Sequence, residues 1–234
     1  MLEDFCVLLL VCGNFFHEAK MNAKKVVSLL PVAFLVACGG GSSGDDTVTV
    51  FPIEGAVTTY LTTPRSFTAN YTDPQNNDVF VLGYVHTPGA DSSFEGNAAK
   101  TVNVAVEIKR NGVQVSQSSQ VDYFQTSPFR YLGSIDGGGE YSVAANQAAL
   151  PTTASVGATG NFYTGTSYTN STKSTVTGTQ TTVWSLQRDT PSTALFCTNS
   201  TFKSTGNPDL TSSECYKINA SGTVIGNRIS LSVP

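Results

Sequence analysis

Charged side chains are scarce in this chain of 234 residues. Asp, Glu, Lys and Arg make up 13% of it, whereas soluble domains usually carry about 25%. Coiled coils, long helical bundles and charge-driven disordered chains all need more of these residues, so the composition excludes them. The net charge of −4 also excludes a broadly basic surface for nucleic acid. Ser, Thr, Gly and Asn fill the gap, which indicates a β-rich exported protein.

Histidine is scarce as well, with two in the whole chain. Most hydrolase sites need a histidine base beside an acid and a nucleophile, and His86 has no such motif around it. We therefore interpret His86 as a polar residue near the end of a strand. A G-x-S-x-G elbow, a phosphate-binding loop and a dinucleotide fingerprint are all missing, and zinc needs more His or Cys ligands than the chain offers. We expect no catalytic residue, no metal site of this kind and no cofactor.

Long apolar runs are missing too, except near the N-terminus. From Met21, Lys24 and Lys25 precede an apolar run at residues 26–37. This order is typical of a secretory signal. The run is shorter than the ~20 residues of a membrane-spanning helix, and Pro31 interrupts it.

The end of this run, residues 35–38, reads Leu-Val-Ala-Cys and resembles the lipobox of bacterial lipoproteins. The resemblance implies cleavage between Ala37 and Cys38, with attachment of lipid to the Cys38 sulfur and acylation of the new amino group. Gly39 stands where an Asp would retain a lipoprotein in the inner membrane. The resemblance therefore implies a lipid anchor in the outer membrane, with the protein facing the periplasm or the cell surface.

These features divide the chain into segments. Residues 1–20 carry Glu3 and Asp4 ahead of an apolar run, which opposes export, so we interpret them as an overextended start. The signal peptide follows at 21–37, and the lipidated cysteine with its Gly/Ser tether at 38–47. Such a tether spans only about 16 Å, which keeps the folded part close to the membrane. The predicted β subdomains cover 48–150 and 151–234, with one continuous sheet assembly as the alternative.

Cleavage would remove Cys6 and Cys12, and lipid would occupy Cys38, so two of the five cysteines stay free, Cys197 and Cys215. In an oxidising compartment two such cysteines form a disulfide. A redox or metal-binding pair is the alternative, but their spacing is far from C-x-x-C and no histidine cluster lies near. The sequence therefore favours the disulfide.

The clearest strand pattern, at residues 101–123, predicts a β-hairpin. Asn111 and Gly112 form the dipeptide that best satisfies a type I′ turn. A two-residue turn pairs position 110 with 113, 108 with 115 and 102 with 121. This register places the apolar side chains of both strands on one face, namely Val102, Val104, Val106, Ile108, Val113, Val115, Val121 and Tyr123.

Shorter apolar runs lie between Gly-, Pro- and Asn-rich turns over the rest of the body, and beyond the leader no stretch keeps a 3.6-residue period. This pattern predicts an all-β fold, an antiparallel β-sandwich or a barrel-like architecture. The candidate strands are residues 67–71, 79–86, 141–143, 182–186, 194–198, 215–218, 223–225 and 229–233.

The body also resembles uncharacterised β-rich lipoproteins of proteobacteria over residues 48–233. No known activity comes with this resemblance. It rests on residues 84–89, on Tyr123 and Phe124 with Pro128, on residues 132–134, on Phe196 with Cys197, and on Cys215 with Tyr216.

An oxygen-rich loop is a candidate calcium site, because carboxylate and amide oxygens suit that ion. Its residues are Asp73, Asn76, Asn77 and Asp78. The alternative is that these residues simply make a turn.

Aromatic side chains offer a platform for a carbohydrate or a peptide, although on strands they more often belong to the core. The candidates are Tyr60, Tyr71, Tyr84, Phe162, Tyr163, Tyr168 and Trp184.

Taken together, the sequence predicts a membrane-anchored lipoprotein with a non-catalytic structural, adhesion or ligand-binding role in the cell envelope. The membrane is one expected partner, and an envelope protein or a carbohydrate is another. The alternative is a hydrolase that acts on a polysaccharide with two carboxylates about 5–10 Å apart, but no spacing selects the pair. A deep cleft with paired acids would favour the hydrolase, and a filled sandwich with flat faces would favour binding.

Overall fold

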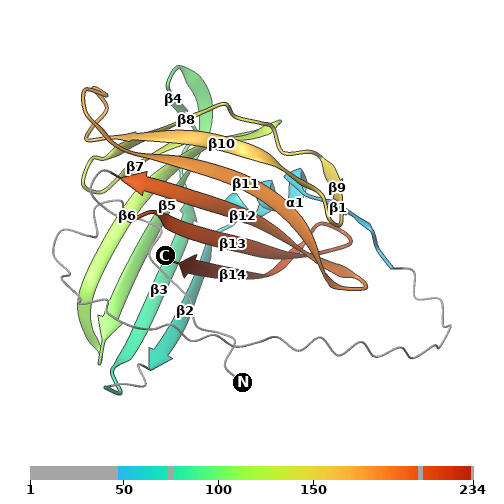
Figure 1. Cartoon of the computed structure of the whole chain (residues 1–234), viewed down its shortest axis with the longest axis horizontal. Helices are drawn as coiled ribbons and strands as arrows, with labels where there is room; N and C mark the ends of the chain where they lie inside the picture. The colour runs from blue at the N-terminus through green and yellow to red at the C-terminus, as the bar shows by residue number, and fades with distance from the viewer. Residues whose placement is uncertain (1–46, 73–75, 205–207, 233–234) are drawn as a thin grey trace.

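One antiparallel sheet of twelve strands makes up most of the protein (Figure 1). This computed structural model describes residues 47–72, 76–204 and 208–232. The strand order is β14-β13-β12-β11-β10-β8-β7-β6-β5-β3-β2, with β4 paired to β5 outside this path, and β1 and β9 form a separate two-stranded ribbon. The all-β, antiparallel fold predicted from the sequence is confirmed.

The described residues form fourteen strands and one helix. Their bounds are β1 Val50–Pro52, α1 Glu54–Leu61, β2 Arg65–Thr72, β3 Val79–Pro88, β4 Ser92–Phe94, β5 Asn97–Arg110, β6 Val113–Thr126, β7 Phe129–Asp136, β8 Tyr141–Ala145, β9 Thr153–Ser155, β10 Thr159–Tyr168, β11 Val176–Thr190, β12 Thr193–Ser204, β13 Leu210–Asn219 and β14 Val224–Ser232.

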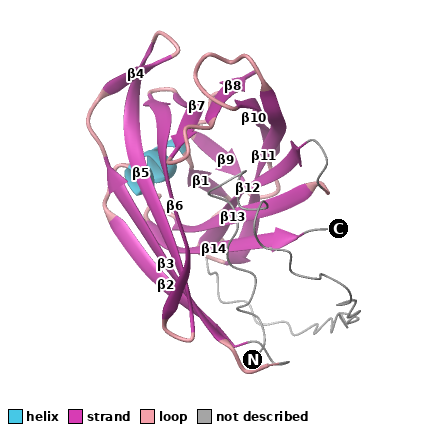
Figure 2. Cartoon of the chain, turned by 90° about the vertical axis from the view of Figure 1, so that its left-hand side faces the viewer, coloured by secondary structure: helices cyan, strands magenta, loops and turns pink. Residues whose placement is uncertain are grey.

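The large sheet is strongly curved (Figure 2). It is not a closed barrel, because its two edge strands, β2 and β14, do not pair with each other. Helix α1 lies on the concave side. Its Tyr60 ring contacts His86 of β3 and Tyr216 of β13, with centroid distances of 5.7 and 4.5 Å. The helix therefore joins two distant parts of the sheet where direct strand pairing does not.

The proposed subdomain boundary near residue 151 falls between β8 and β9. Strand β8 pairs with β10 across it, for example at Ala145 and Thr164. Both halves of the chain therefore contribute strands to one sheet.

The turn predicted at Asn111 and Gly112 is confirmed. Both residues have positive φ, 51° and 81°, as a type I′ turn requires. The adjacent pair, Arg110 with Val113, also follows the predicted register.

Beyond this turn the predicted register is wrong. A β-bulge between Ile108 and Lys109 shifts the pairing by one residue, so that Ile108 pairs with Ser116 and Val102 pairs with Asp122. Because side chains alternate between the faces of a strand, one extra residue sends every later side chain to the other face.

This shift reverses the predicted faces of β6. Val113 and Val115, beside the turn, are 67% and 54% exposed. Beyond the bulge, Tyr123 stacks on Phe94, whereas Asp122 pairs with Val102 and shares its concave face. The sequence pattern could not reveal the bulge, because the apolar residues of β6 alternate as they would in a regular strand without one.

Helix α1 was not predicted from the sequence. It has eight residues and buries Ala56, Val57 and Tyr60, a face too short to show a sustained 3.6-residue period. A side-chain contact fixes it to the sheet, because the Phe129 N–H donates to Glu54 Oε1 at 2.8 Å. Within the described part of the chain, no helix has both the length and the apolar character needed to cross a membrane.

The main hydrophobic core lies between α1, the small ribbon and the concave face of the sheet. Its fully buried side chains include Phe51, Ile53, Leu186 and Ile218, all 0% exposed. A smaller cluster around Phe94 and Tyr141 covers part of the outer face. The core therefore fills only part of the concave side.

Candidate functional site

The remaining concave space is a cavity of about 630 Å³. This volume lies within the roughly 300–1,000 Å³ typical of small-molecule sites. Helix α1 and strands from both halves of the chain line it, from β3 through to β13. The curvature of the sheet therefore brings residues far apart in sequence to one site.

The alternation of strand residues decides which side chains reach this cavity. In β13, Ser212, Glu214 and Tyr216 line it, and in β12 Phe196 and Thr198 do so. The residues between them point to the outer face, because successive side chains in a strand face opposite sides.

Within the described part of the chain, five tyrosines line the cavity. Tyr131 and Tyr163 have ring centroids 4.7 Å apart, and Tyr60 and Tyr216 are in edge contact. Such rings provide apolar walls that also carry hydroxyl groups. The five are Tyr60, Tyr84, Tyr131, Tyr163 and Tyr216.

The aromatic platform suggested by the sequence is thus gathered in part. Of its candidates Tyr60, Tyr84, Phe162 and Tyr163 line the cavity. Trp184 belongs instead to the buried core, at 7% exposed.

Two carboxylates from distant strands reach the same cavity, Asp122 from β6 and Glu214 from β13. Asp122 Oδ1 accepts hydrogen bonds from Gln120 Nε2 at 2.8 Å and from the Tyr131 hydroxyl at 3.2 Å. Burial, with a smaller contribution from the charge of Glu214, raises the pKa of Asp122 to about 7, although the hydrogen bonds from Tyr131 and Gln120 lower it. Burial also raises the pKa of Glu214.

Sequence reasoning did not find this pair. The predicted hairpin register placed Asp122 on the polar outer face, and the bulge in β5–β6 reverses that position. Nothing in the spacing of Asp122 and Glu214 connects two residues that lie on strands so far apart.

Uncharged polar side chains form a network on the β11 and β12 part of the wall. Gln180 Nε2 donates to the Tyr163 hydroxyl at 2.7 Å and to Ser200 Oγ at 3.2 Å. Thr182 and Ser200 are joined by a hydroxyl–hydroxyl hydrogen bond of 2.9 Å. The cavity is therefore polar along one wall and aromatic along another.

His86 lines the cavity from near the end of β3 and is 1% exposed. Its Nε2 lies 2.8 Å from the Leu61 carbonyl oxygen, so Nε2 carries the proton and Nδ1 is an acceptor. Burial lowers the pKa of His86, which favours the neutral ring. Among the described residues, Nδ1 has no hydrogen-bond partner.

The candidate calcium loop is described only in part, since Asp73 lies outside the described residues. Asn76 Oδ1 accepts from the Asp78 N–H at 2.9 Å, in a turn. The Asp78 carboxylate accepts from Arg110 and, at 2.6 Å, from Asn111 Nδ2. No group of three or more His, Cys, Asp or Glu suited to a metal occurs within the described ranges. The calcium site stays a prediction from the sequence.

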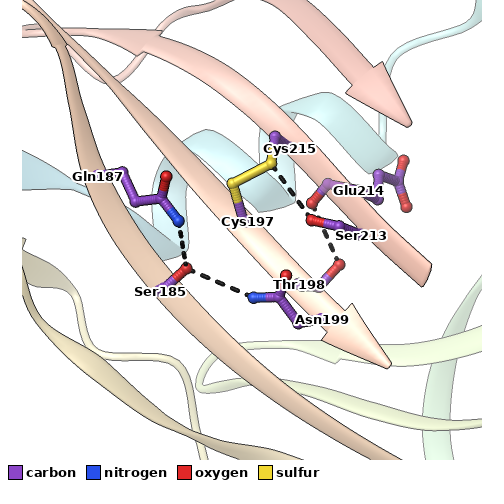
Figure 3. The surroundings of a disulfide bond; sticks show 8 residues. All are labelled: Ser185, Gln187, Cys197, Thr198, Asn199, Ser213, Glu214 and Cys215. Carbon is purple, nitrogen blue, oxygen red and sulfur yellow. Dashed lines mark hydrogen bonds between the residues drawn. A yellow bond between two sulfur atoms is a disulfide. The ribbon is translucent and has the colours of Figure 1, made fainter. Parts of the chain in front are cut away.

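The predicted disulfide is confirmed: Cys197 and Cys215 are joined across the paired strands β12 and β13 (Figure 3). It lies on the outer face, beside Ser213 and Asn199, and does not line the cavity. The predicted cleavage and lipidation site, Ala37 and Cys38, lies outside the described residues.

Comparisons with protein-family models, with curated proteins and with solved structures find no match. The function is therefore inferred from the chemistry of the cavity. This cavity offers aromatic walls, hydroxyl and amide groups, and four carboxylates.

Proposed function

We propose that this chain is a binding protein of the bacterial envelope that holds a small polar organic molecule in its cavity. The observation that carries the proposal is the cavity of about 630 Å³, whose walls combine tyrosine rings with convergent polar groups. Sites for small molecules have this combination of apolar walls and a few orienting polar groups.

Filling the cavity with a large side chain tests whether it binds a ligand. Ser200 lies on its wall and is 9% exposed, so Ser200→Trp places an indole in the space that a ligand would occupy. In a thermal-shift screen of small polar metabolites, we expect compounds that raise the Tm of the wild type to lose this effect in Ser200→Trp.

The matched control for this screen is Asn199→Trp. Asn199 is the adjacent residue of β12 and lies on the outer face, where its amide donates to Ser185 Oγ at 3.5 Å. This variant should keep the response of the wild type. Compounds that shift all three proteins equally, or a screen without any shift in the wild type, would argue against a ligand in the cavity.

The second part of the proposal is a lipid anchor at Cys38, which brings the binding domain to the outer membrane. It is supported by the lipobox-like residues 35–38 and the Gly/Ser tether after them. We expect labelled palmitate to be incorporated into the wild type and not into Cys38→Ser. Labelling that survives the substitution would refute the anchor.

A polysaccharide hydrolase is the second candidate function, because Asp122 and Glu214 share one cavity. A carboxyl group whose pKa is raised to about 7, as in Asp122, suits a general acid at neutral pH. Release of reducing ends from envelope polysaccharides by the wild type and not by Asp122→Asn would favour catalysis. A ligand that stays chemically unchanged in the cavity would favour binding.

A further inference from the structure

We propose that the cavity selects an organic cation with N–H donors, an aliphatic diamine or polyamine, and that Asp122 and Glu214 receive its ammonium groups. This inference rests on the proposed function of the cavity as a ligand site. It goes further by assigning the charge and the hydrogen-bonding character of the ligand.

The acidic groups of the cavity wall favour a cationic ligand. Among the residues that the structure describes, four carboxylates line the cavity, against a single ammonium group, that of Lys203. The Lys203 ammonium lies 3.5 Å from the Asp209 carboxylate, and both side chains are largely exposed. The carboxylates that line the cavity thus outnumber its cationic groups. The four carboxylates belong to Asp122, Asp136, Glu140 and Glu214.

The two deepest carboxylates also interact with each other. The charge of Glu214 disfavours ionisation of Asp122, because like charges in an enclosed site repel. A neutral ligand leaves that repulsion in place, and an anion increases it. A cation between the two groups converts the repulsion into attraction.

Hydrogen-bond acceptors without a donor in the cavity wall independently favour a ligand with N–H groups. Both hydrogen bonds to Asp122 reach Oδ1, so Oδ2 has no donor among the described residues. His86 adds a buried Nδ1 acceptor without a partner in the same part of the chain. A ligand with N–H donors complements such a wall, whereas a ligand rich in acceptors does not.

The tyrosine rings also favour a cationic ligand, since the face of an aromatic ring attracts a cation. The chain already uses one of these rings in this way: the Arg65 guanidinium carbon lies 4.4 Å from the centroid of the Tyr60 ring. The other cavity tyrosines, including Tyr84 and Tyr131, offer further aromatic surface to the methylene groups of an amine.

Three probes of nearly equal size and different charge test the inference: 1,5-diaminopentane, 1,5-pentanediol and glutarate. Isothermal titration calorimetry with the purified full chain at pH 7.5 should show the tightest binding for the diamine. We expect at least about tenfold weaker binding of the diol and no measurable binding of glutarate. Equal or tighter binding of the diol, binding of glutarate, or no binding of the diamine would overturn the inference.

Isosteric variants locate the effect. Asp122→Asn and Glu214→Gln should each weaken binding of the diamine by about tenfold or more and leave binding of the diol unchanged. Glu107→Gln is the matched control, since Glu107 lies on strand β5 outside the cavity and pairs with Lys109 at 2.9 Å. Unchanged diamine binding in both cavity variants would also overturn the inference.

These outcomes separate the two proposals. If neutral or anionic compounds bind and Ser200→Trp abolishes their effect, the cavity is a ligand site and the preference for a cation is wrong. If the diamine binds equally well to the wild type, Ser200→Trp, Asp122→Asn and Glu214→Gln, the cation does not sit in the cavity and both proposals fail together.

Discussion

The double variant Cys197→Ala/Cys215→Ala is expected to lose about 3 kcal/mol of unfolding free energy. The two cysteines are 18 residues apart in sequence. A bond that closes this loop limits the conformations of the unfolded chain, so its removal favours unfolding. The measurement is urea denaturation of both proteins under oxidising conditions, compared by their free energies of unfolding.

Reduction provides the control for this experiment. Dithiothreitol should destabilise the wild type to nearly the level of the double variant and leave the double variant unchanged. Because the disulfide lies on the outer face of β12 and β13, ligand binding by the folded double variant should stay within about twofold of the wild type. Equal stability of the wild type and the double variant would show that the disulfide adds no constraint to the unfolded chain.

Asp122→Asn is expected to stabilise the protein at pH 7.5 by about 2 kcal/mol and to have little effect at pH 4. Burial raises the pKa of Asp122 from 3.8 to about 7, a shift that corresponds to at most about 4 kcal/mol. Solvent in the cavity screens part of it. Asparagine is the same size, does not ionise, and keeps an oxygen for Gln120 and Tyr131.

The pH dependence of the stability difference follows from the direction of the pKa shift of Asp122. A raised pKa means that folded Asp122 keeps its proton after the unfolded chain has lost it. Its contribution to stability is therefore complete below about pH 4 and is lost as the pH rises toward 7. Wild type and variant should have the same stability at the acid end and diverge over this range.

Thermal and urea unfolding between pH 4 and pH 8 measure this divergence. The difference between the two proteins isolates Asp122, because both contain the other shifted groups, such as Glu214 and Asp189. Glu107→Gln serves again as the control and should change stability by less than about 0.5 kcal/mol at each pH. A variant that is less stable than the wild type at pH 7.5 would contradict the raised pKa.

Much of the sheet could be predicted from alternation and turn residues. The candidate strands at 67–71 and 79–86 lie within β2 and β3, and those at 194–198 and 215–218 lie within β12 and β13. Strands β7 and β10 were missed, because Gly133 and Ser134 in β7 and residues 164–167 in β10 interrupt their apolar runs. Polar side chains are tolerated at the inward positions of these strands because they face a cavity and not a dry core.

The sequence by itself determined the local chemistry: the type I′ turn at Asn111 and Gly112, the all-β class, and the two cysteines available for a disulfide. These features depend on neighbours in the chain or on composition. The tertiary structure alone decided that a bulge between Ile108 and Lys109 turns Asp122 inward, and that curvature brings Glu214 to the same cavity. The register of a strand depends on its partner and the curvature on the whole sheet, and neither is encoded in a short stretch of sequence.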